Sequence, residues 1–322
     1  KVIYLFLILT ITHSAMSFGL EDFFNLRISQ DKINLPNDIS EVDQQFDLNL
    51  SEKIPSAPVL VLSPVHEKCE FRVYNYIGQV LNTYSRCIEV ATDETWLLSK
   101  LYEVKTHGDK LCQAVKADEH FKSGNFSIFA MSTGGMMARY LIEYCDFDLP
   151  IRNVVAVGAP LNGVSALQHQ DRKTMTGRVT DWVVDKLINY SFMDRVIVGA
   201  DYWRDPVHVD NYMKHSRFLA EANNEINFKE ERKESWIELN RAHFIKFEKD
   251  DTIIPAESAH WGQLDENWNV VDRHDTDIFK DDLIGLFTLE TLKKTEYTSW
   301  PGDHLEFNFT QINSDVLPTL RH

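Results

Sequence analysis

The sequence lacks any run of about 18 apolar residues, the length that a transmembrane helix needs. It also lacks a basic excess: 33 Lys and Arg stand against 49 Asp and Glu, a formal net charge of −16. This balance argues against nucleic acid or an anionic membrane surface as a partner. No internal repeat or low-complexity tract is present, and 322 residues with 43% hydrophobic content fit one large or two ordinary globular domains.

Cysteine is scarce, and the four cysteines lack the paired Cys/His spacing of a metal site. They are Cys69, Cys87, Cys112 and Cys145. An even number of cysteines in an oxidising compartment indicates disulfide bonds. We therefore expect no metal and no cofactor.

The N-terminal residues predict a secretory signal peptide. An apolar run, Val2–Ile11, is followed by Ala15 and Ser17, small residues that suit a cleavage site. We assign residues 1–17 to this signal, and residues 18–53, which are acidic and show no sustained apolar period, to a loosely attached arm. A helix or strand packed on the body is the alternative for this arm. Four N-x-Ser/Thr sequons agree with a glycoprotein of the secretory pathway: Asn49, Asn125, Asn189 and Asn308.

Residues 54–322 alternate buried strand-like runs with helical stretches, which predicts an α/β fold with a mostly parallel sheet and helices on both faces. The strand candidates are Val59–Leu62, Cys87–Val90, Ile128–Met131, Val154–Gly158, His243–Phe247 and Glu296–Trp300. Helices are expected over 74–81 and 104–117. Residues 160–240 contain helical pieces without a convincing strand, and we expect them to form an insertion over the active site.

The stretch Ile128–Cys145 has the pattern of a nucleophile elbow: an apolar run stops at Ser132, two glycines follow, and a helix-forming stretch begins at once. Such a turn requires small residues two before and two after the serine, and these are Ala130 and Gly134. This short pattern is common by chance. In its strand-to-helix context, however, it places Ser132 where helix N–H groups stabilise an oxyanion.

The partners of a catalytic serine follow in the order that α/β hydrolases use, which is Ser, then acid, then His. Asp250 and Asp251, just after one strand candidate, offer the acid. His304, just after the last strand candidate, offers the base. Neither loop is informative alone, but together with Ser132 they predict a Ser–His–Asp hydrolase of the α/β-hydrolase fold.

Several stretches of the C-terminal half carry a more specific pattern. They are Ala-Asp-Tyr-Trp-Arg-Asp-Pro at 200–206, His-Ser-Arg-Phe-Leu-Ala at 215–220, Lys-Phe-Glu-Lys-Asp-Asp at 246–251 and Gly-Asp-His-Leu at 302–305. In these stretches the chain resembles the palmitoyl-protein thioesterase family, from about Pro58 to the C-terminus. The resemblance implies Ser132 as nucleophile, His304 as base and Asp250, five residues before a proline, as acid. Asp251 remains the rival, because many other α/β hydrolases carry the acid four residues before a proline.

The resemblance also implies a disulfide between Cys112 and Cys145, which leaves Cys69 with Cys87. The chain departs from the family where a glycine-rich run follows the first buried strand, since residues 63–67 read Ser-Pro-Val-His-Glu. Proline has no N–H, but the donor position falls on Val65. With the N–H of Thr133, Val65 would complete a two-donor oxyanion hole.

The activity implied is hydrolysis of long-chain acyl (palmitoyl) thioesters. The expected substrates are S-acylated proteins or peptides, or acyl-CoA. We expect a monomer of the secretory pathway, in a lysosome-like compartment or secreted. A catalytically weakened lipid-binding homologue and an oxygen-ester lipase or esterase are the alternatives.

Overall fold

The computed structural model describes residues 33–34, 56–64, 68–69, 73–89, 104–166 and 201–321. Several predictions lie outside the described residues. These are the signal peptide at 1–17, all of the acidic arm except 33–34, the oxyanion residue Val65, the sequons at Asn49 and Asn189, and residues 167–200 of the insertion.

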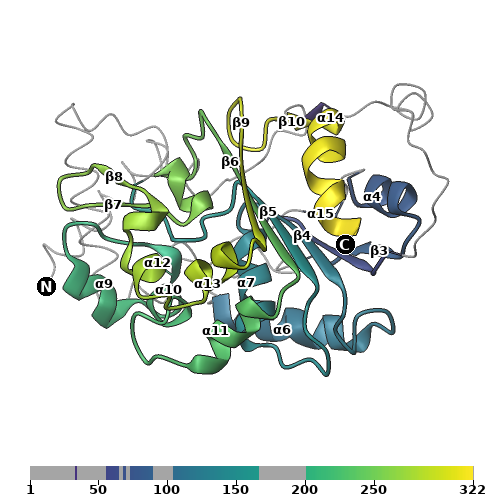
Figure 1. Cartoon of the computed structure of the whole chain (residues 1–322), viewed down its shortest axis with the longest axis horizontal. Coiled ribbons are helices and arrows are strands. Elements are labelled where there is room, and N and C mark those ends of the chain that lie inside the picture. The colour runs from purple at the N-terminus through teal and green to yellow at the C-terminus, as the bar shows by residue number, and fades with distance from the viewer. Residues whose placement is uncertain are drawn as a thin grey trace, which may run out of the picture.

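A six-stranded sheet with strand order β3-β2-β4-β5-β6-β9 forms the centre of the molecule (Figure 1), and every neighbouring pair is parallel. The strands are β2 (Val59–Leu62), β3 (Ser85–Cys87), β4 (Ser127–Met131), β5 (Asn153–Val157), β6 (Arg241–Phe247) and β9 (Thr295–Trp300). The predicted α/β fold is therefore confirmed. β3 begins two residues before its predicted position. As an edge strand it carries the polar residues Ser85 and Arg86, so the apolar run that suggested Cys87–Val90 lay too far along the chain.

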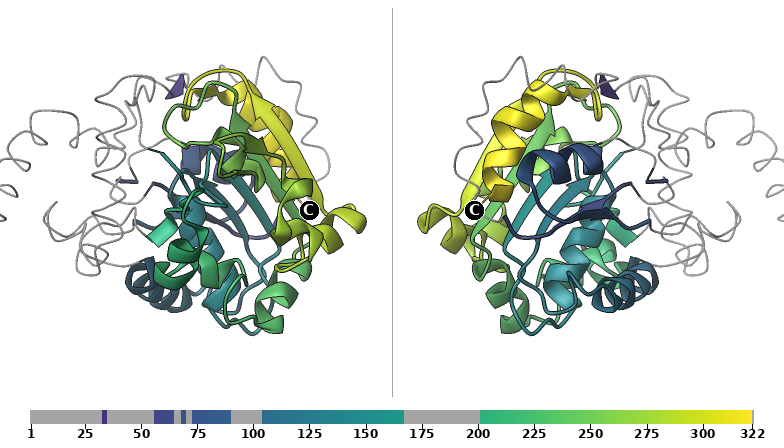
Figure 2. Two further views of the ribbon diagram at one scale, coloured as in Figure 1. Left: turned by 90° about the vertical axis from the view of Figure 1, so that its left-hand side faces the viewer. Right: turned by 90° about the vertical axis from the view of Figure 1, so that its right-hand side faces the viewer.

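Helices cover both faces of the sheet (Figures 1 and 2). One face packs against α4 (Val73–Leu81) and the C-terminal helices α14 (Phe309–Gln311), η6 (Ile312–Val316) and α15 (Leu317–Arg321). The other packs against α6 (Val104–Ala117), α7 (Gly134–Tyr144) and α11 (Glu230–Ile237). Along the four central strands, β2, β4, β5 and β6, side chains alternate between the two hydrophobic clusters, as parallel strands buried on both faces require.

The described parts of the predicted insertion, 160–166 and 201–240, contain α9 (Val209–His215), α10 (Leu219–Ala222) and α11, and one isolated bridge between Val164 and Trp203. The smaller elements after β6 are η4 (Ala256–His260), β7 (Gln263–Leu264), β8 (Val270–Val271), η5 (Arg273–Asp275), α12 (Asp277–Lys280) and α13 (Leu286–Thr291). Within residues 18–53, β1 (Ile33–Asn34) pairs in parallel with β10 (Phe307–Asn308).

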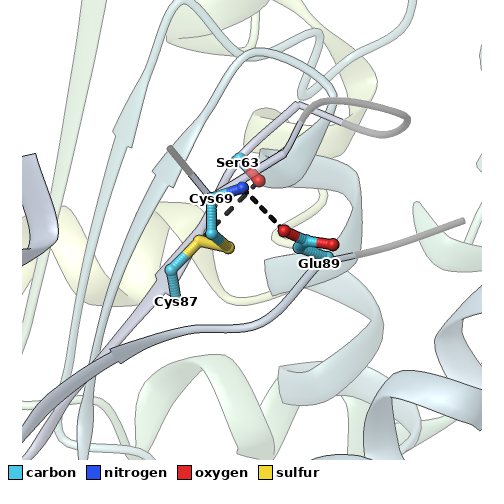
Figure 3. Close-up of a disulfide and its surroundings, with 4 residues drawn as sticks. All are labelled: Ser63, Cys69, Cys87 and Glu89. Carbon is cyan, nitrogen blue, oxygen red and sulfur yellow. Dashed lines mark hydrogen bonds between the residues drawn. A yellow bond between two sulfur atoms is a disulfide. The ribbon is translucent and has the colours of Figure 1, made fainter. Parts of the chain in front are cut away.

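Two disulfides join Cys69 to Cys87 and Cys112 to Cys145, the pairs implied by the resemblance. The first bond links the end of β3 to the segment that follows β2 (Figure 3), and the Cys69 N–H donates to Glu89 Oε1 at 3.0 Å. The second links α6 to the end of α7. Closing loops of 18 and 33 residues stabilises a fold by about 3–4 kcal/mol per bond in the chain-entropy description.

Two of the predicted glycosylation sites, Asn125 and Asn308, are exposed. Asn308 also caps α14, where its Oδ1 accepts from the Gln311 N–H. Among the helices that the structure describes, none combines the length and apolar character needed to cross a membrane.

His260, at the end of η4, makes the fold sensitive to acid. Its Nε2 lies 3.0 Å from the carbonyl oxygen of Thr298, and its ring packs edge-on against Tyr297. Burial is the main reason that the pKa of His260 falls from 6.5 to about 4. The folded chain therefore keeps this imidazole neutral, whereas the unfolded chain binds a proton below about pH 6.5. Burial also lowers the pKa of His243 on β6, which acts in the same direction.

The free energy of unfolding is expected to fall as the pH falls from about 6.5 to 4, with about 3 kcal/mol of the loss due to His260. His260→Gln removes that titration, so its stability should depend less steeply on pH than that of the wild type. Urea unfolding at several pH values across this window measures the difference. His120→Gln, at a half-exposed histidine, is the control. Parallel pH profiles for the wild type and His260→Gln would contradict the assignment.

Candidate active site

Ser132 lies directly after β4, in the sharp turn that leads into α7. Its φ of +50° is in the left-handed region that most residues avoid, and its N–H donates to the Val157 carbonyl at 2.8 Å. A Cβ at Gly134 would lie only 2.5 Å from the carbonyl oxygen of Leu62. Glycine at this position therefore lets α7 begin beside the end of β2.

His304 lies four residues after β9, with its side chain only 6% exposed. Its Nε2 is 3.0 Å from Ser132 Oγ. Gly158, at φ +56°, leaves room for the ring, since a Cβ there would lie 3.3 Å from His304 Cε1 and 2.9 Å from the ring of Phe247. The glycine in the turn after β5 thus leaves the space that the imidazole of His304 occupies beside Ser132.

Asp250, three residues after β6, provides the carboxylate at the other side of the imidazole. Its Oδ2 is 2.8 Å from His304 Nδ1, and its Oδ1 accepts from the N–H groups of Thr252 and Ile253 at 3.0 and 2.9 Å. Of the two candidate acids, Asp250 is therefore the one bonded to His304. Its two backbone contacts hold the carboxylate in one orientation, which fixes the imidazole ring in turn.

Backbone hydrogen bonds tie the loop that carries the acid to the loop that carries the base. The Glu248 N–H donates to the Trp300 carbonyl and the Lys249 N–H to the Gly302 carbonyl, both at 2.9 Å. Ser132, Asp250 and His304 all follow the carboxyl ends of strands in one parallel sheet, the edge at which such sheets assemble their sites.

Thr133, the predicted second oxyanion donor, follows Ser132 at the N-terminus of α7. The aligned peptide dipoles of that helix favour negative charge beside its first N–H groups. Val65 lies outside the described residues, so the two-donor oxyanion hole stays a prediction.

A buried polar network around Arg139 of α7, the helix that follows Ser132, was not predicted from the sequence. Arg139 on α7 is fully buried and donates from Nε to Glu143 Oε1 at 2.8 Å, and from Nη1 to the Leu161 carbonyl at 2.6 Å and to Asn223 Oδ1 at 2.9 Å. Burial raises the pKa of Glu143 despite the neighbouring guanidinium. The network joins α7 to the insertion. The only signal for it in the sequence was an Arg and a Glu four residues apart in an otherwise apolar helix.

The parallel sheet, the serine in a left-handed turn after β4 and the hydrogen-bonded Ser–His–Asp chain in this order define an α/β-hydrolase fold with a hydrolase-type triad. The family model described as "Palmitoyl protein thioesterase" matches residues 58–304, and the chain belongs to this family. The family resemblance seen in the sequence is thereby confirmed.

Relatives with curated names agree with this assignment. Palmitoyl-protein thioesterase 1 of Caenorhabditis elegans is 27% identical over 208 residues, which cover 64% of this chain and 69% of the relative. Lysosomal thioesterase PPT2-B of Xenopus laevis is 26% identical over 193 residues, which cover 56% of this chain and 65% of the relative. The chain thus spans about two thirds of the length of these relatives. Among solved structures, MenH from S. aureus overlaps 82% of this chain and 93% of its own, at 13% identity and a TM-score of 0.39, too low to bear on function.

Proposed function

We propose that the protein hydrolyses long-chain fatty acyl thioesters, such as palmitoyl groups on cysteines of proteins or peptides, with Ser132, His304 and Asp250 as its triad. The observation that carries the proposal is the unbroken hydrogen-bond chain from Ser132 Oγ through both nitrogens of His304 to Asp250 Oδ2, at 3.0 and 2.8 Å. Membership of the family supports the choice of a thioester over other acyl substrates.

In the proposed reaction, His304 Nε2 takes the proton of Ser132 Oγ as the oxygen attacks the thioester carbonyl carbon. The N–H groups of Thr133 and Val65 would stabilise the oxyanion. The C–S bond then breaks, and the imidazolium returns its proton to the cysteine sulfur. His304 then takes a proton from a water molecule as the water oxygen attacks the acyl-serine carbonyl carbon. The bond between this carbon and Ser132 Oγ breaks, the imidazolium returns the proton to Oγ, and the fatty acid is released. Asp250 orients the imidazole and stabilises its charged form throughout.

The proposed place of action is the secretory pathway, in a lysosome-like compartment or outside the cell. The two disulfides support an oxidising compartment. The name of the Xenopus relative, a lysosomal thioesterase, supports a lysosomal destination.

The substrate class is tested with matched pairs of long-chain thioesters and oxygen esters that differ only in the bridging atom. We expect the larger kcat/KM for the thioester, because a thiol of pKa about 8.5 leaves more readily than an alcohol. A larger kcat/KM for the oxygen ester would indicate a lipase or esterase. Retention of fatty acid without turnover, and without reaction of Ser132 with a fluorophosphonate, would indicate a lipid-binding homologue.

A further inference from the structure

We infer that Asp315 and Trp300 position the His304 base: the carboxylate of Asp315, on η6, holds the end of β9, the strand that precedes the histidine loop. The inference rests on the proposed function, since it assigns these residues an effect on the reaction of Ser132. Neither residue touches the proposed reacting atoms, so both act through their neighbours.

The first contact joins Trp300 to Asp315. Trp300 is the last residue of β9, four residues before His304, and is 2% exposed. Its indole Nε1–H donates to Asp315 Oδ2 at 2.6 Å. A hydrogen bond to a charged carboxylate is shorter and stronger than one between neutral groups. The bond therefore fixes the rotation of the indole ring and the end of β9.

Asp315 is itself held to the sheet through its main chain. His243 Nδ1, on β6, lies 3.1 Å from the Asp315 carbonyl oxygen, and His243 Nε2 lies 2.8 Å from Thr298 Oγ1 on β9. Asp315 belongs to η6, a short stretch of π-helix. Such stretches are rare in proteins, and many of those known lie at functional sites. Asp315 thus contacts His243 of β6 through its backbone carbonyl and Trp300 of β9 through its side chain.

The second step runs from Trp300 to the triad through Phe247. The rings of Trp300 and Phe247 meet edge to face at 5.9 Å between centroids, and those of Phe247 and His304 at 6.2 Å. Phe247 ends β6, three residues before Asp250, and its ring is the one that a Cβ at Gly158 would contact. The base is therefore packed against an aromatic side chain that Trp300 contacts, and the loop with Asp250 begins directly after that residue.

Loss of this support is expected to loosen the His304 ring rather than to unfold the chain. A displacement of about 1 Å in a catalytic group lowers turnover by up to about 10²-fold while leaving substrate binding in place. The hydrogen bond is therefore expected to affect kcat and the pH profile of serine reactivity more than KM.

Two substitutions remove the same bond from opposite sides. Trp300→Phe deletes the donor and keeps an aromatic ring, whereas Asp315→Leu deletes the acceptor and leaves the indole unchanged. Asp315→Asn keeps an oxygen acceptor and tests for rescue. The matched control is Tyr76→Phe, which removes a bond of equal length between α4 and the same π-helix, from Tyr76 Oη to Asn313 Oδ1 at 2.6 Å. That bond joins α4 to η6 and does not involve β9.

Each variant is assayed for thioester kcat and KM, for the rate of fluorophosphonate labelling of Ser132 against pH, and for its unfolding temperature. We expect Trp300→Phe and Asp315→Leu to lower kcat about tenfold at unchanged KM, Asp315→Asn to stay within about twofold of the wild type, and Tyr76→Phe to lose stability only. Equal kcat and labelling profiles in Trp300→Phe, Asp315→Leu and Tyr76→Phe would overturn the inference while the proposed function stands. Wild-type protein that is folded but neither labels nor turns over would instead overturn the proposed function.

Discussion

Ser132→Ala is expected to lower kcat for a long-chain thioester by about 10⁴–10⁶-fold while the free energy of unfolding stays close to that of the wild type. The substitution removes the nucleophilic oxygen together with its contact to His304 Nε2. Alanine meets the same backbone requirement as serine at φ +50°, so no new strain is introduced. The remaining contacts of the turn, including the bond from the residue-132 N–H to Val157, are made by the backbone.

The measurement pairs steady-state kinetics with urea unfolding of both proteins. Ser314→Ala is the control, because Ser314 is an exposed serine whose loss leaves the triad intact. Turnover by folded Ser132→Ala at the wild-type rate would remove Ser132 from the mechanism, and with it the proposed triad.

Asp250→Asn is expected to lower kcat by about 10⁴-fold, whereas Asp251→Asn stays near the wild-type rate. An amide at position 250 still accepts from Thr252 and Ile253, so the loop keeps its shape. Its NH₂ group then faces His304 Nδ1, which in the wild type lies 2.8 Å from Asp250 Oδ2 and donates its hydrogen bond to that oxygen. The imidazole is driven into the tautomer that protonates Nε2, and this tautomer cannot take the proton of the serine.

The two asparagine variants are compared by kcat and by the rate at which Ser132 reacts with a fluorophosphonate. Both substitutions remove one negative charge from adjacent positions, so general electrostatic effects are shared and each variant controls for the other. A loss of activity in Asp251→Asn with Asp250→Asn unaffected would reverse the assignment of the acid.

Structural features that depend on residues close together in the chain, such as strands and tight turns, were predicted well from the sequence. The strands β2, β4, β5 and β6 were predicted to within two residues, because strands buried on both faces appear as short continuous apolar runs. The edge strand β9 was also predicted to within one residue, although it carries exposed polar residues. The elbow at Ser132 was visible because the sharp turn requires small neighbours at fixed offsets. The edge strand β3 was misplaced because it has only three residues and begins with the polar Ser85 and Arg86, where no apolar run marks a strand.

The sequence by itself determined the periodic elements, the order of the serine, acid and histidine loops, and the family. Only the tertiary structure shows that Asp250 contacts His304, and only it joins Arg139 to the insertion and Trp300 to Asp315. Adjacent loop residues have the same local pattern, and the register of packed strands and helices alone decides which of them faces a histidine 54 positions away. Buried polar side chains form hydrogen bonds with whichever groups the fold places beside them, because an unpaired polar group in the core raises the free energy of the folded state. The partners of such hydrogen bonds are far apart in the sequence, so the local periodicity of apolar residues cannot predict them.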